Sequence, residues 1–444
     1  MGEYRIMSEN YLNVTVDQTE IGADMHRLMT ELYPICRSIT GDGLRESLRI
    51  IQKHIPLELH EVPTGTRVFD WTVPKEWNIR DAYVKGPSGE KVIDFQRSSL
   101  HVVNYSVPVH KIMPLQELKE HLHSIPGKPD LIPYITSYYR ENWGFCLSHR
   151  LLQSLEEGEY EVHIDSSLED GHLTYGECFL KGAIDDEVLI SAHSCHPSLC
   201  NDNLSGMVLA TFLARYLQNQ ELRYSYRFLL APGTIGAITW LALNEKRASR
   251  IKHGLTAACV GDSGHFTYKK TRRGNAEIDQ VVPYVLKRSS QDFEVFDFTP
   301  YDYDERQYNS PGFNLPVGNL ARTPHDRYTE NHTSADNLDF VKPEYLADSF
   351  ANYSMVLGIL EKNKRYLNTN PKCEPQLGKR GLYGAFGGKK DANQYEVAML
   401  WVLNFSDGCH TLLDIAEKSR FSFDVIQKTA MMLAEHNLLE EVHE

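Results

Sequence analysis

Five side chains of metal-binding types stand close together in the segment VLISAHSCHPSLCNDNLSG, which covers residues 188–206. Imidazole and carboxylate groups both bind zinc, and a short loop between them would hold the donor atoms near one another. We therefore predict a metal site in this segment. The candidate donors are His193, Cys195, His196, Cys200 and Asp202.

The predicted donors follow a predicted strand. Residues 188–191 are apolar or small and are typical of a buried strand, and the run MVLATFLARYLQ from Met207 is typical of a helix. Side chains at the end of a strand are presented at the edge of an α/β sheet, where such proteins place their chemistry. A polar corner between strand and helix is also common in proteins without metals, and a single histidine there is more often a cap.

Two more residues at predicted strand ends extend the site. Asp262 follows the buried run TAACVG, and it is either a metal ligand or the cap of the next turn. His332 lies in the polar segment ENHTSADNLDFV, ahead of a helix that begins near Pro343. With His193 and Asp202, His332 would complete a three-ligand zinc site that leaves one position open for water.

The elements that must position these residues alternate along the chain. From Tyr138 to Met355, strands at 187–193, 224–231 and 254–262 alternate with helices at 207–218 and 234–247. This order predicts an α/β domain with a mixed or parallel sheet and helices on both faces. The segments 160–168 and 172–182 are expected to form a hairpin-like pair.

Two further regions flank this pattern. Residues 61–129 are rich in Val, Tyr and Trp in alternating segments, which predicts a small inserted β-rich domain. The main domain would then take residues 17–60 and 130–365. After a Pro- and Gly-rich linker, residues 375–444 show three short helices and an extended end, which resemble a winged helix or a helix-turn-helix.

Composition and charge exclude several classes of function. The 444 residues carry a net charge of -14, which argues against a nucleic-acid groove because phosphates require a concentration of Lys and Arg. Residues 375–444 hold 7 Lys+Arg and 10 Asp+Glu, so a protein partner or homo-oligomer contact is favoured for this region over DNA. We expect no membrane segment, because no stretch approaches ~20 apolar residues.

The compartment is predicted from the same composition. No apolar core of a signal peptide stands near Met1, and the eight cysteines include no CxxC pair. Both features favour reduced thiols and a cytoplasmic protein.

The motifs in their order resemble the zinc aminopeptidases and the related glutaminyl cyclases. AHSCHPSLCNDNLSG is similar to their first metal motif, CVGD to the next ligand aspartate, YDERQYNSPGFNLP to the loop before a Gly-Ile-Pro strand, and ENHTSADN to the final His motif. A narrower resemblance, through YPICRSITGDG and IPYITSYYRENWGFC, is to bacterial aminopeptidase-like proteins with an inserted β module and a C-terminal winged helix. It implies a zinc-aminopeptidase-like mixed sheet flanked by helices.

The resemblance places a metal on His193, Asp202 and His332, with Asp262 as a fourth ligand and His196 as a competitor of His193. The chain departs from the family at Cys195, where the aminopeptidases have an aspartate that orients the first histidine.

A second departure concerns the general base. Gly233 and Thr234 stand where the aminopeptidases have two glutamates, one a general base and one a metal ligand. One zinc ion is therefore expected rather than two. Asp304 or Glu305 would replace the base if their loop folds over the cleft, Glu330 is a further candidate, and a site with no carboxylate base is the remaining possibility.

These residues predict a zinc-dependent hydrolase that cleaves an amide bond in a small peptide or an aminoacyl conjugate. Arg37, Arg306 or Arg322 would hold a carboxylate of the substrate. The alternative is an aminopeptidase scaffold that has lost its base and acts as a binding or regulatory protein through its C-terminal domain.

Overall fold

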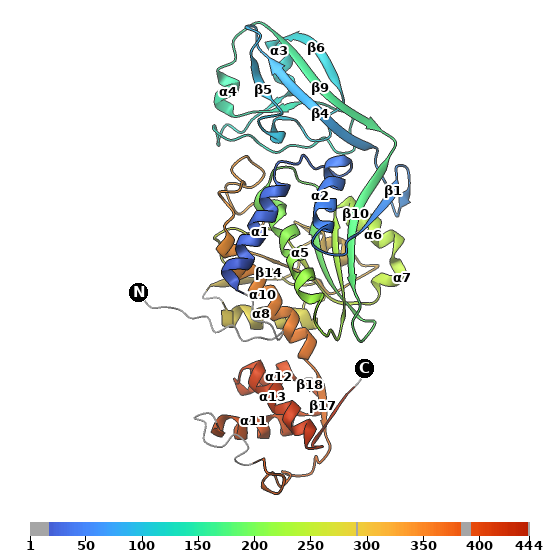
Figure 1. Ribbon diagram of the computed structural model, residues 1–444, viewed down its shortest axis with the longest axis vertical. Coiled ribbons are helices and arrows are strands. Elements are labelled where there is room, and N and C mark those ends of the chain that lie inside the picture. Colours follow the sequence, from blue (N-terminus) through green and yellow to red (C-terminus); the bar gives the residue numbers. More distant parts are fainter. Residues whose placement is uncertain (1–16, 290–291, 383–391, 443–444) are drawn as a thin grey trace, which may run out of the picture. The chain divides into compact units, whose positions relative to one another are not determined.

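The computed structural model describes residues 17–289, 292–382 and 392–442. The described residues fall into two compact units, which divide between Asn352 and Tyr353. The first unit contains the large central sheet and every predicted site residue, so the fold is described from there (Figure 1).

The central sheet has eight strands and is mixed. Four neighbouring strands in its middle run parallel, and strands at both sides run antiparallel to them. In spatial order the strands are β1 (Glu58–Pro63), β10 (His172–Leu180), β12 (Ser225–Ala231), β11 (Glu187–His193), β13 (Ile251–Ala257), β16 (Val317–Ala321), β14 (Phe266–Lys269) and β15 (Phe293–Phe296).

The sequence of β11 explains its central place. All seven of its residues are buried, as expected for a parallel strand that is covered on both faces. Its carboxyl end is His193, and in the parallel register this residue lies beside Ala231 at the end of β12. The predicted metal segment therefore begins at the carboxyl edge of the sheet, and the predicted strand 187–193 is confirmed.

Helices flank this sheet, which confirms the predicted α/β class. Helix α5 packs against β10 to β13, α8 packs against β13 to β16, and α2 contacts β10. Among the described residues, none of the helices is both long and apolar enough to cross a membrane. The helices of this unit are α1 (Gln18–Leu32), α2 (Asp42–Gln52), α5 (Ser205–Leu217), α6 (Ile235–Leu243), α7 (Glu245–Ala248), α8 (Glu277–Ser289), α9 (Glu305–Tyr308) and the start of α10 (Pro343–Lys362).

A second, four-stranded sheet has its own hydrophobic core. Its order is β5 (Lys91–Asp94), β4 (Glu76–Lys85), β9 (Glu159–Glu169) and β6 (Val109–Pro114). Buried residues from Ala82 to Ile164 fill this core, so its strands come from both sides of position 129. Short elements complete the region: β2 (Arg67–Val68), β3 (Trp71–Thr72), η1 (Ser99–His101), α3 (Leu115–Leu118), η2 (Lys119–His121), β7 (Leu122–His123), β8 (Phe145–Cys146) and α4 (His149–Gln153).

The predicted hairpin of β9 and β10 is wrong. The two strands follow each other closely, but β9 pairs with β4 and β6, whereas β10 pairs with β1 and β12. The chain passes from one sheet to the other at Asp170 and Gly171, where Thr64 donates a backbone hydrogen bond to the Gly171 carbonyl. Spacing alone does not reveal such a passage, because a hairpin needs the same short connection.

The described part of the second unit contains the end of α10, the helices α11 to α13 and a three-stranded sheet of order β18-β17-β19. The Thr411 side chain and Asp414 form a capping box at the start of α12, which fixes that helix end. The predicted helices and extended end are present, and the sheet was not predicted. The elements are β17 (Arg365–Asn368), η4 (Gly378–Arg380), α11 (Ala392–Phe405), β18 (Asp407–Thr411), α12 (Leu412–Ser419), α13 (Phe423–Glu435) and β19 (Leu439–Glu441).

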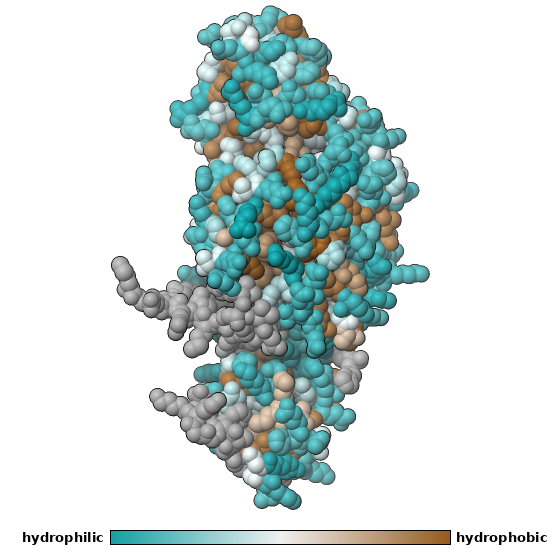
Figure 2. All heavy atoms as spheres, viewed as in Figure 1, coloured by the Kyte–Doolittle hydropathy of each residue, from teal (hydrophilic) through white to brown (hydrophobic). Residues whose placement is uncertain are grey.

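Hydrophilic residues cover most of the face seen in Figure 2, with apolar residues scattered between them. Such scattering is ordinary for a folded chain and by itself marks no binding surface.

Candidate metal centre

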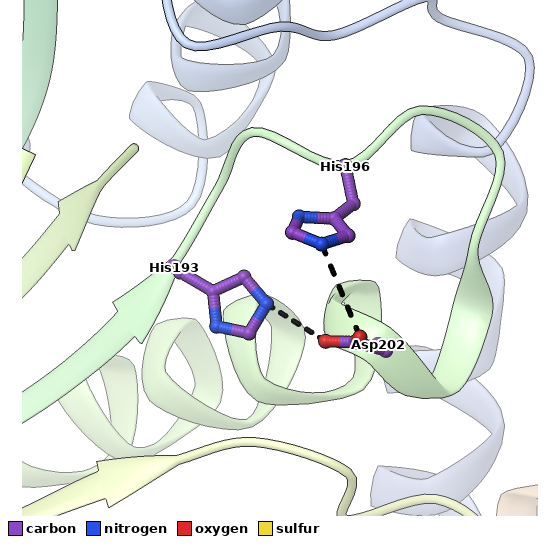
Figure 3. A group of neighbouring side chains, drawn as sticks. All are labelled: His193, His196 and Asp202. Atoms are coloured by element: carbon purple, nitrogen blue, oxygen red, sulfur yellow. Dashed lines mark hydrogen bonds and ion pairs between the residues drawn. The ribbon is translucent and has the colours of Figure 1, made fainter. Parts of the chain in front are cut away.

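Asp202 is the centre of a cluster of histidines. It lies in the turn η3 (Cys200–Leu204) just before α5, and both of its carboxylate oxygens face imidazole nitrogens (Figure 3). His193 Nε2 lies 2.8 Å from Asp202 Oδ1, and His332 Nε2 lies 2.9 Å from Asp202 Oδ2. His196 Nε2 is 4.0 Å from Asp202 Oδ2. The predicted residues 193, 196, 202 and 332 are thus brought together.

The donors form two groups of three that share Asp202. In each group, the donor atoms lie within 4.8 Å of one another. The first group is His193, His196 and Asp202, and the second is Asp202, His325 and His332. His193 and His196 both face the Asp202 carboxylate, so both stay candidate ligands.

The charge states of these groups suit a cation. Burial lowers the pKa of His196 well below its usual value, so its imidazole is neutral, which is the form that binds metal. Burial disfavours the carboxylate of Asp202, but the neighbouring histidines outweigh it and hold its pKa well below the usual range. Several imidazoles converge on one ionised carboxylate, and this donor set fits zinc.

The turn that carries Asp202 is held by Asp336. The Asp336 carboxylate accepts backbone hydrogen bonds from Asn201 at 2.6 Å and from Asp202 at 3.0 Å. Burial raises the pKa of Asp336 to about 7. Because Asp336 follows His332 by four residues, the same loop delivers a donor and fixes the turn opposite it.

Asp262 lies outside both groups. Its Oδ1 accepts hydrogen bonds from the Gly264 amide at 2.7 Å and the Thr323 hydroxyl at 2.5 Å. Its Oδ2 accepts from the Asn201 side chain at 3.0 Å and the Thr323 amide at 3.2 Å. This is the arrangement of the turn cap that the sequence left open, and the fourth-ligand role of Asp262 stays a prediction.

Asp304 brings a carboxylate next to Gly233, the position where the aminopeptidases have a glutamate and this chain does not. A cavity of about 160 Å³ is lined by the histidines above and by Gly233, Thr234 and Asp304. A Cβ atom built on Gly233 would lie 3.6 Å from Asp304 Oδ1. This oxygen is buried and has no hydrogen-bond partner among the described residues. Burial raises the pKa of Asp304 to about 7.

Glu305 is engaged elsewhere. Its Oε1 lies 2.6 Å from the Lys269 ammonium on β14, and its Oε2 accepts a hydrogen bond from Thr256. Glu330 accepts a hydrogen bond from the neighbouring Thr329 hydroxyl and does not line the cavity. Of the three predicted carboxylates, Asp304 alone combines a place on the cavity wall with an unpartnered oxygen.

The three predicted substrate arginines have different surroundings. Arg37 is fully buried and donates to the carbonyl oxygens of His196 and Leu32, so it holds the loop of His196. Arg322 donates to the Gly264 carbonyl and to Asp348. None of the three arginines lines the cavity. Arg306 is half-buried and has no side-chain hydrogen bond or ion pair with the described part of the chain.

Sequence reasoning missed three residues of the cavity. His325 completes the second donor group, Tyr303 stacks on His193 with ring centroids 5.6 Å apart, and Asp302 lines the wall. His325 follows Pro324 in a loop without periodic pattern, and no local signal distinguishes it from a surface histidine. Its distance of seven residues from His332 was the available hint.

The mixed sheet with histidine and aspartate donors at its carboxyl edge defines an aminopeptidase-like protein. The chain belongs to the family described as a domain of unknown function (DUF4910), whose sequence model matches residues 26–363. Residues 364–441 match a winged helix-turn-helix domain. The expected winged helix and its place at the C-terminus are thereby confirmed.

Relatives agree with this assignment. The chain is 55% identical over 426 residues to a Clostridium acetobutylicum protein named "putative polysaccharide biosynthesis protein with aminopeptidase-like domain", covering 96% of this chain and 98% of that one. A crystal structure described as a "putative peptidase" from the same organism has 54% identity and a TM-score of 0.91, covering 96% of this chain and 97% of that one.

More distant structures share the fold. A zinc aminopeptidase from Bacillus subtilis has 11% identity and a TM-score of 0.55, covering 78% of this chain and 95% of that one. A peptidase M28 precursor from Shewanella amazonensis has 13% identity and a TM-score of 0.53, covering 80% of this chain and 95% of that one. At such identities the likeness concerns the fold, and the chemistry has to be argued from the residues of this chain.

Proposed function

We propose that this protein is a zinc-dependent hydrolase of an amide bond in a small aminoacyl or acyl conjugate. The observation that carries the proposal is the convergence of four histidines, Asp202 and the unpartnered Asp304 oxygen on one cavity. Zinc held by these donors would supply Lewis-acid activation of water and of the amide carbonyl.

Two donor groups would hold the metal. His193, His196 and Asp202 form one position, and Asp202, His325 and His332 form the other. The sequence favoured a single ion because Thr234 replaces a ligand glutamate. Histidines 196 and 325 supply nitrogen donors near that gap, so we propose two positions that share Asp202.

The protein's own residues would move the proton and hold the substrate. Asp304 is the proposed general base: its unpartnered Oδ1 on the cavity wall would accept the proton of the attacking water. Arg306, two residues further on, is the proposed contact for an anionic group of the substrate. Tyr303 limits the freedom of the His193 ring by stacking on it.

The name of the Clostridium acetobutylicum relative supports a substrate class. A role in polysaccharide biosynthesis is said of that protein, which is 55% identical to this chain. A sugar that carries an acylated or aminoacylated amine contains the amide bond that such a site would cleave. We therefore propose an amino-sugar amide as the substrate.

Metal content tests the proposed centre. We expect two zinc ions per purified chain, measured by elemental analysis after dialysis. Asp202→Asn should lose both ions, whereas His196→Ala and His325→Ala should each lose one, because each belongs to a single donor group. His265→Ala is the control, since this exposed histidine pairs with Glu294 outside the cavity. Equal zinc in Asp202→Asn and the unmodified chain would refute the centre.

Turnover separates the hydrolase from the alternative function. The zinc-loaded chain should release free amine from N-acyl amino sugars, and His332→Ala should abolish this release. The absence of carboxylates at Gly233 and Thr234 favours the alternative, a scaffold that binds a partner. A zinc-loaded chain that hydrolyses no sugar amide and no aminoacyl amide would support the scaffold and overturn the hydrolase.

A further inference from the structure

Two large aromatic side chains are exposed side by side. Trp71 and Tyr139 are 44% and 47% exposed, with ring centroids 5.4 Å apart and planes inclined by 58°. We call this pair the aromatic corner. Phe69 is also exposed. Its ring and the ring of Phe313 form a T-shaped pair with centroids 5.8 Å apart. Trp and Tyr are enriched at binding surfaces because they join an apolar ring to a polar group, so we take this pair of Trp71 and Tyr139 as a candidate binding surface.

The corner is anchored next to the cavity wall. Trp71 lies on the hairpin β2–β3, and the buried Val68 and Val73 of this hairpin belong to the same core cluster as Cys195 and Ile235. Strand β2 contacts α6, which starts directly after the cavity residues Gly233 and Thr234. The hairpin is therefore fixed relative to the cavity and does not extend freely into solvent.

A line of aromatic rings connects the corner to the metal donors. Tyr139 contacts Tyr138 at a centroid distance of 6.4 Å, and the Tyr138 hydroxyl lies 2.9 Å from the Tyr134 hydroxyl. The Tyr134 ring in turn lies 5.0 Å from His196 and 5.3 Å from His332. These rings make a chain of contacts that leads from the corner, through Tyr138 and the buried Tyr134, to two of the histidines beside Asp202.

The backbone at the corner supports a role in binding. Tyr139 of the corner has φ of 66°, and Phe69, two residues before Trp71, has φ of 57°. Both values lie in the left-handed region that bulky residues rarely adopt. Glycine or asparagine would adopt this conformation at lower cost. The chain instead presents large rings there, and strained residues of this kind gather at ligand sites.

We propose that the aromatic corner binds the sugar ring of the substrate. Trp and Tyr offer an apolar face to the C–H groups of a pyranose, and the Tyr hydroxyl can bond its hydroxyls. The exposed neighbours Asp70 and Arg140 add charged hydrogen-bonding groups at the rim. The inference rests on the proposed amide hydrolase and adds that recognition of the sugar is separate from the metal donors.

Binding of chitotriose, the trimer of N-acetylglucosamine, tests this subsite by calorimetry. We expect saturable binding to the full chain, with Trp71→Ala and Tyr139→Ala each about tenfold weaker. Trp71→Phe, which keeps a ring, should restore most of the affinity. Phe179→Ala is the matched control: this ring is 42% exposed and pairs with Arg227, four residues before the end of β12. It should bind like the unmodified chain.

Other outcomes have defined meanings. Failure of chitotriose to bind, or equal binding by Trp71→Ala, would overturn the subsite. Binding of phenylalaninamide at the corner in place of chitotriose would assign it to a peptide side chain and would also overturn it. Because binding needs no turnover, sugar that binds to a chain without amidase activity would refute the hydrolase alone.

Discussion

Gly233 and Asp304 illustrate how one residue can compensate for another across the sheet edge. A side chain at position 233 would project toward His193 and toward Asp304 Oδ1. The missing side chain leaves this space open, and the Asp304 carboxylate reaches it from a different loop. A carboxylate can therefore act at the cavity even though residue 233 is glycine. What matters is where the oxygen lies in the cavity, and it can come from any segment of the chain.

The role of Asp304 predicts the effect of removing its charge. Asp304→Asn should lower kcat by about 10²–10⁴-fold, since the proton of the attacking water would lose its acceptor. Zinc content should stay unchanged, because Asp304 is in neither donor group. Glu330→Gln is the control, as Glu330 lies outside the cavity wall, and its kcat should stay within about twofold. If Asp304→Asn and the unmodified chain have equal kcat, Asp304 is not the general base.

Sequence pattern found donors that follow a recognisable element and missed those that do not. His193 and Asp202 bracket a loop between a buried strand and a helix, so spacing predicted their proximity. His332 was predicted from its polar segment ahead of a helix, and the resemblance to the final His motif of the aminopeptidases supported it. His325 and Tyr303 lie in loops where only the tertiary fold brings them to Asp202 and His193. Contacts between distant loops leave no periodic signal in one sequence.

The strand β14 helps to set the orientation of Asp304 through Lys269. Lys269 on β14 donates to the Asp302 carboxylate at 3.0 Å and to the Tyr301 carbonyl, and it lies 2.6 Å from Glu305. The ammonium thus fixes residues on both sides of Asp304. A buried cation with this many acceptors orders a loop because each acceptor would otherwise be left unpaired.

Lys269→Met therefore tests Lys269 as a positioning residue. We expect kcat to fall about 10-fold or more while zinc content stays unchanged, since the loop of Asp304 is loosened and the donors are not touched. Lys269→Arg should recover part of the rate. The control is Lys270→Met, which removes an adjacent lysine whose partner is the exposed Asp297. A rate unchanged in Lys269→Met would show that the loop is held without this ammonium.

The prediction of strands and helices succeeded where the pattern of apolar residues in the sequence matches the pattern of burial in the structure. The strand 187–193 is fully buried and largely apolar between Val188 and Ala192, and the sequence predicted its bounds. The predicted pairing of β9 with β10 failed because two strands joined by a short connection look the same in the sequence whether they share a sheet or not. Partner choice is set by tertiary contacts, here by β4 and β6, and a strand pattern does not encode its partner.

At the scale of the first unit, one carboxylate joins its two sheets. Glu76 on β4 forms an ion pair with Arg45 on α2 and accepts the His172 amide at the start of β10. Arg45 also pairs with Asp42 at the start of α2, so this arginine serves the structure. Gly171 has no side chain there, and a Cβ atom on it would meet Glu76 at 2.5 Å.

This junction makes stability depend on pH. Burial alone would raise the pKa of Glu76, but hydrogen bonds from Arg45, from the His172 amide and from Asn78 outweigh it and lower the pKa to about 2. A carboxyl whose folded pKa lies below its unfolded value of 4.5 stabilises the fold above about pH 4.5. That contribution is lost as the pH falls from 4.5 toward 2.

Glu76→Gln should accordingly lower the thermal unfolding midpoint at pH 7, and the gap to the unmodified chain should narrow steadily below pH 4.5. Glu161→Gln is the matched control, because Glu161 pairs with Lys85 on the surface of the four-stranded sheet and should change the midpoint little. Circular dichroism from pH 3 to pH 7 measures both. A gap that stays constant over this range would mean that the junction stabilises through packing, since only the ionised carboxylate loses its contribution on protonation.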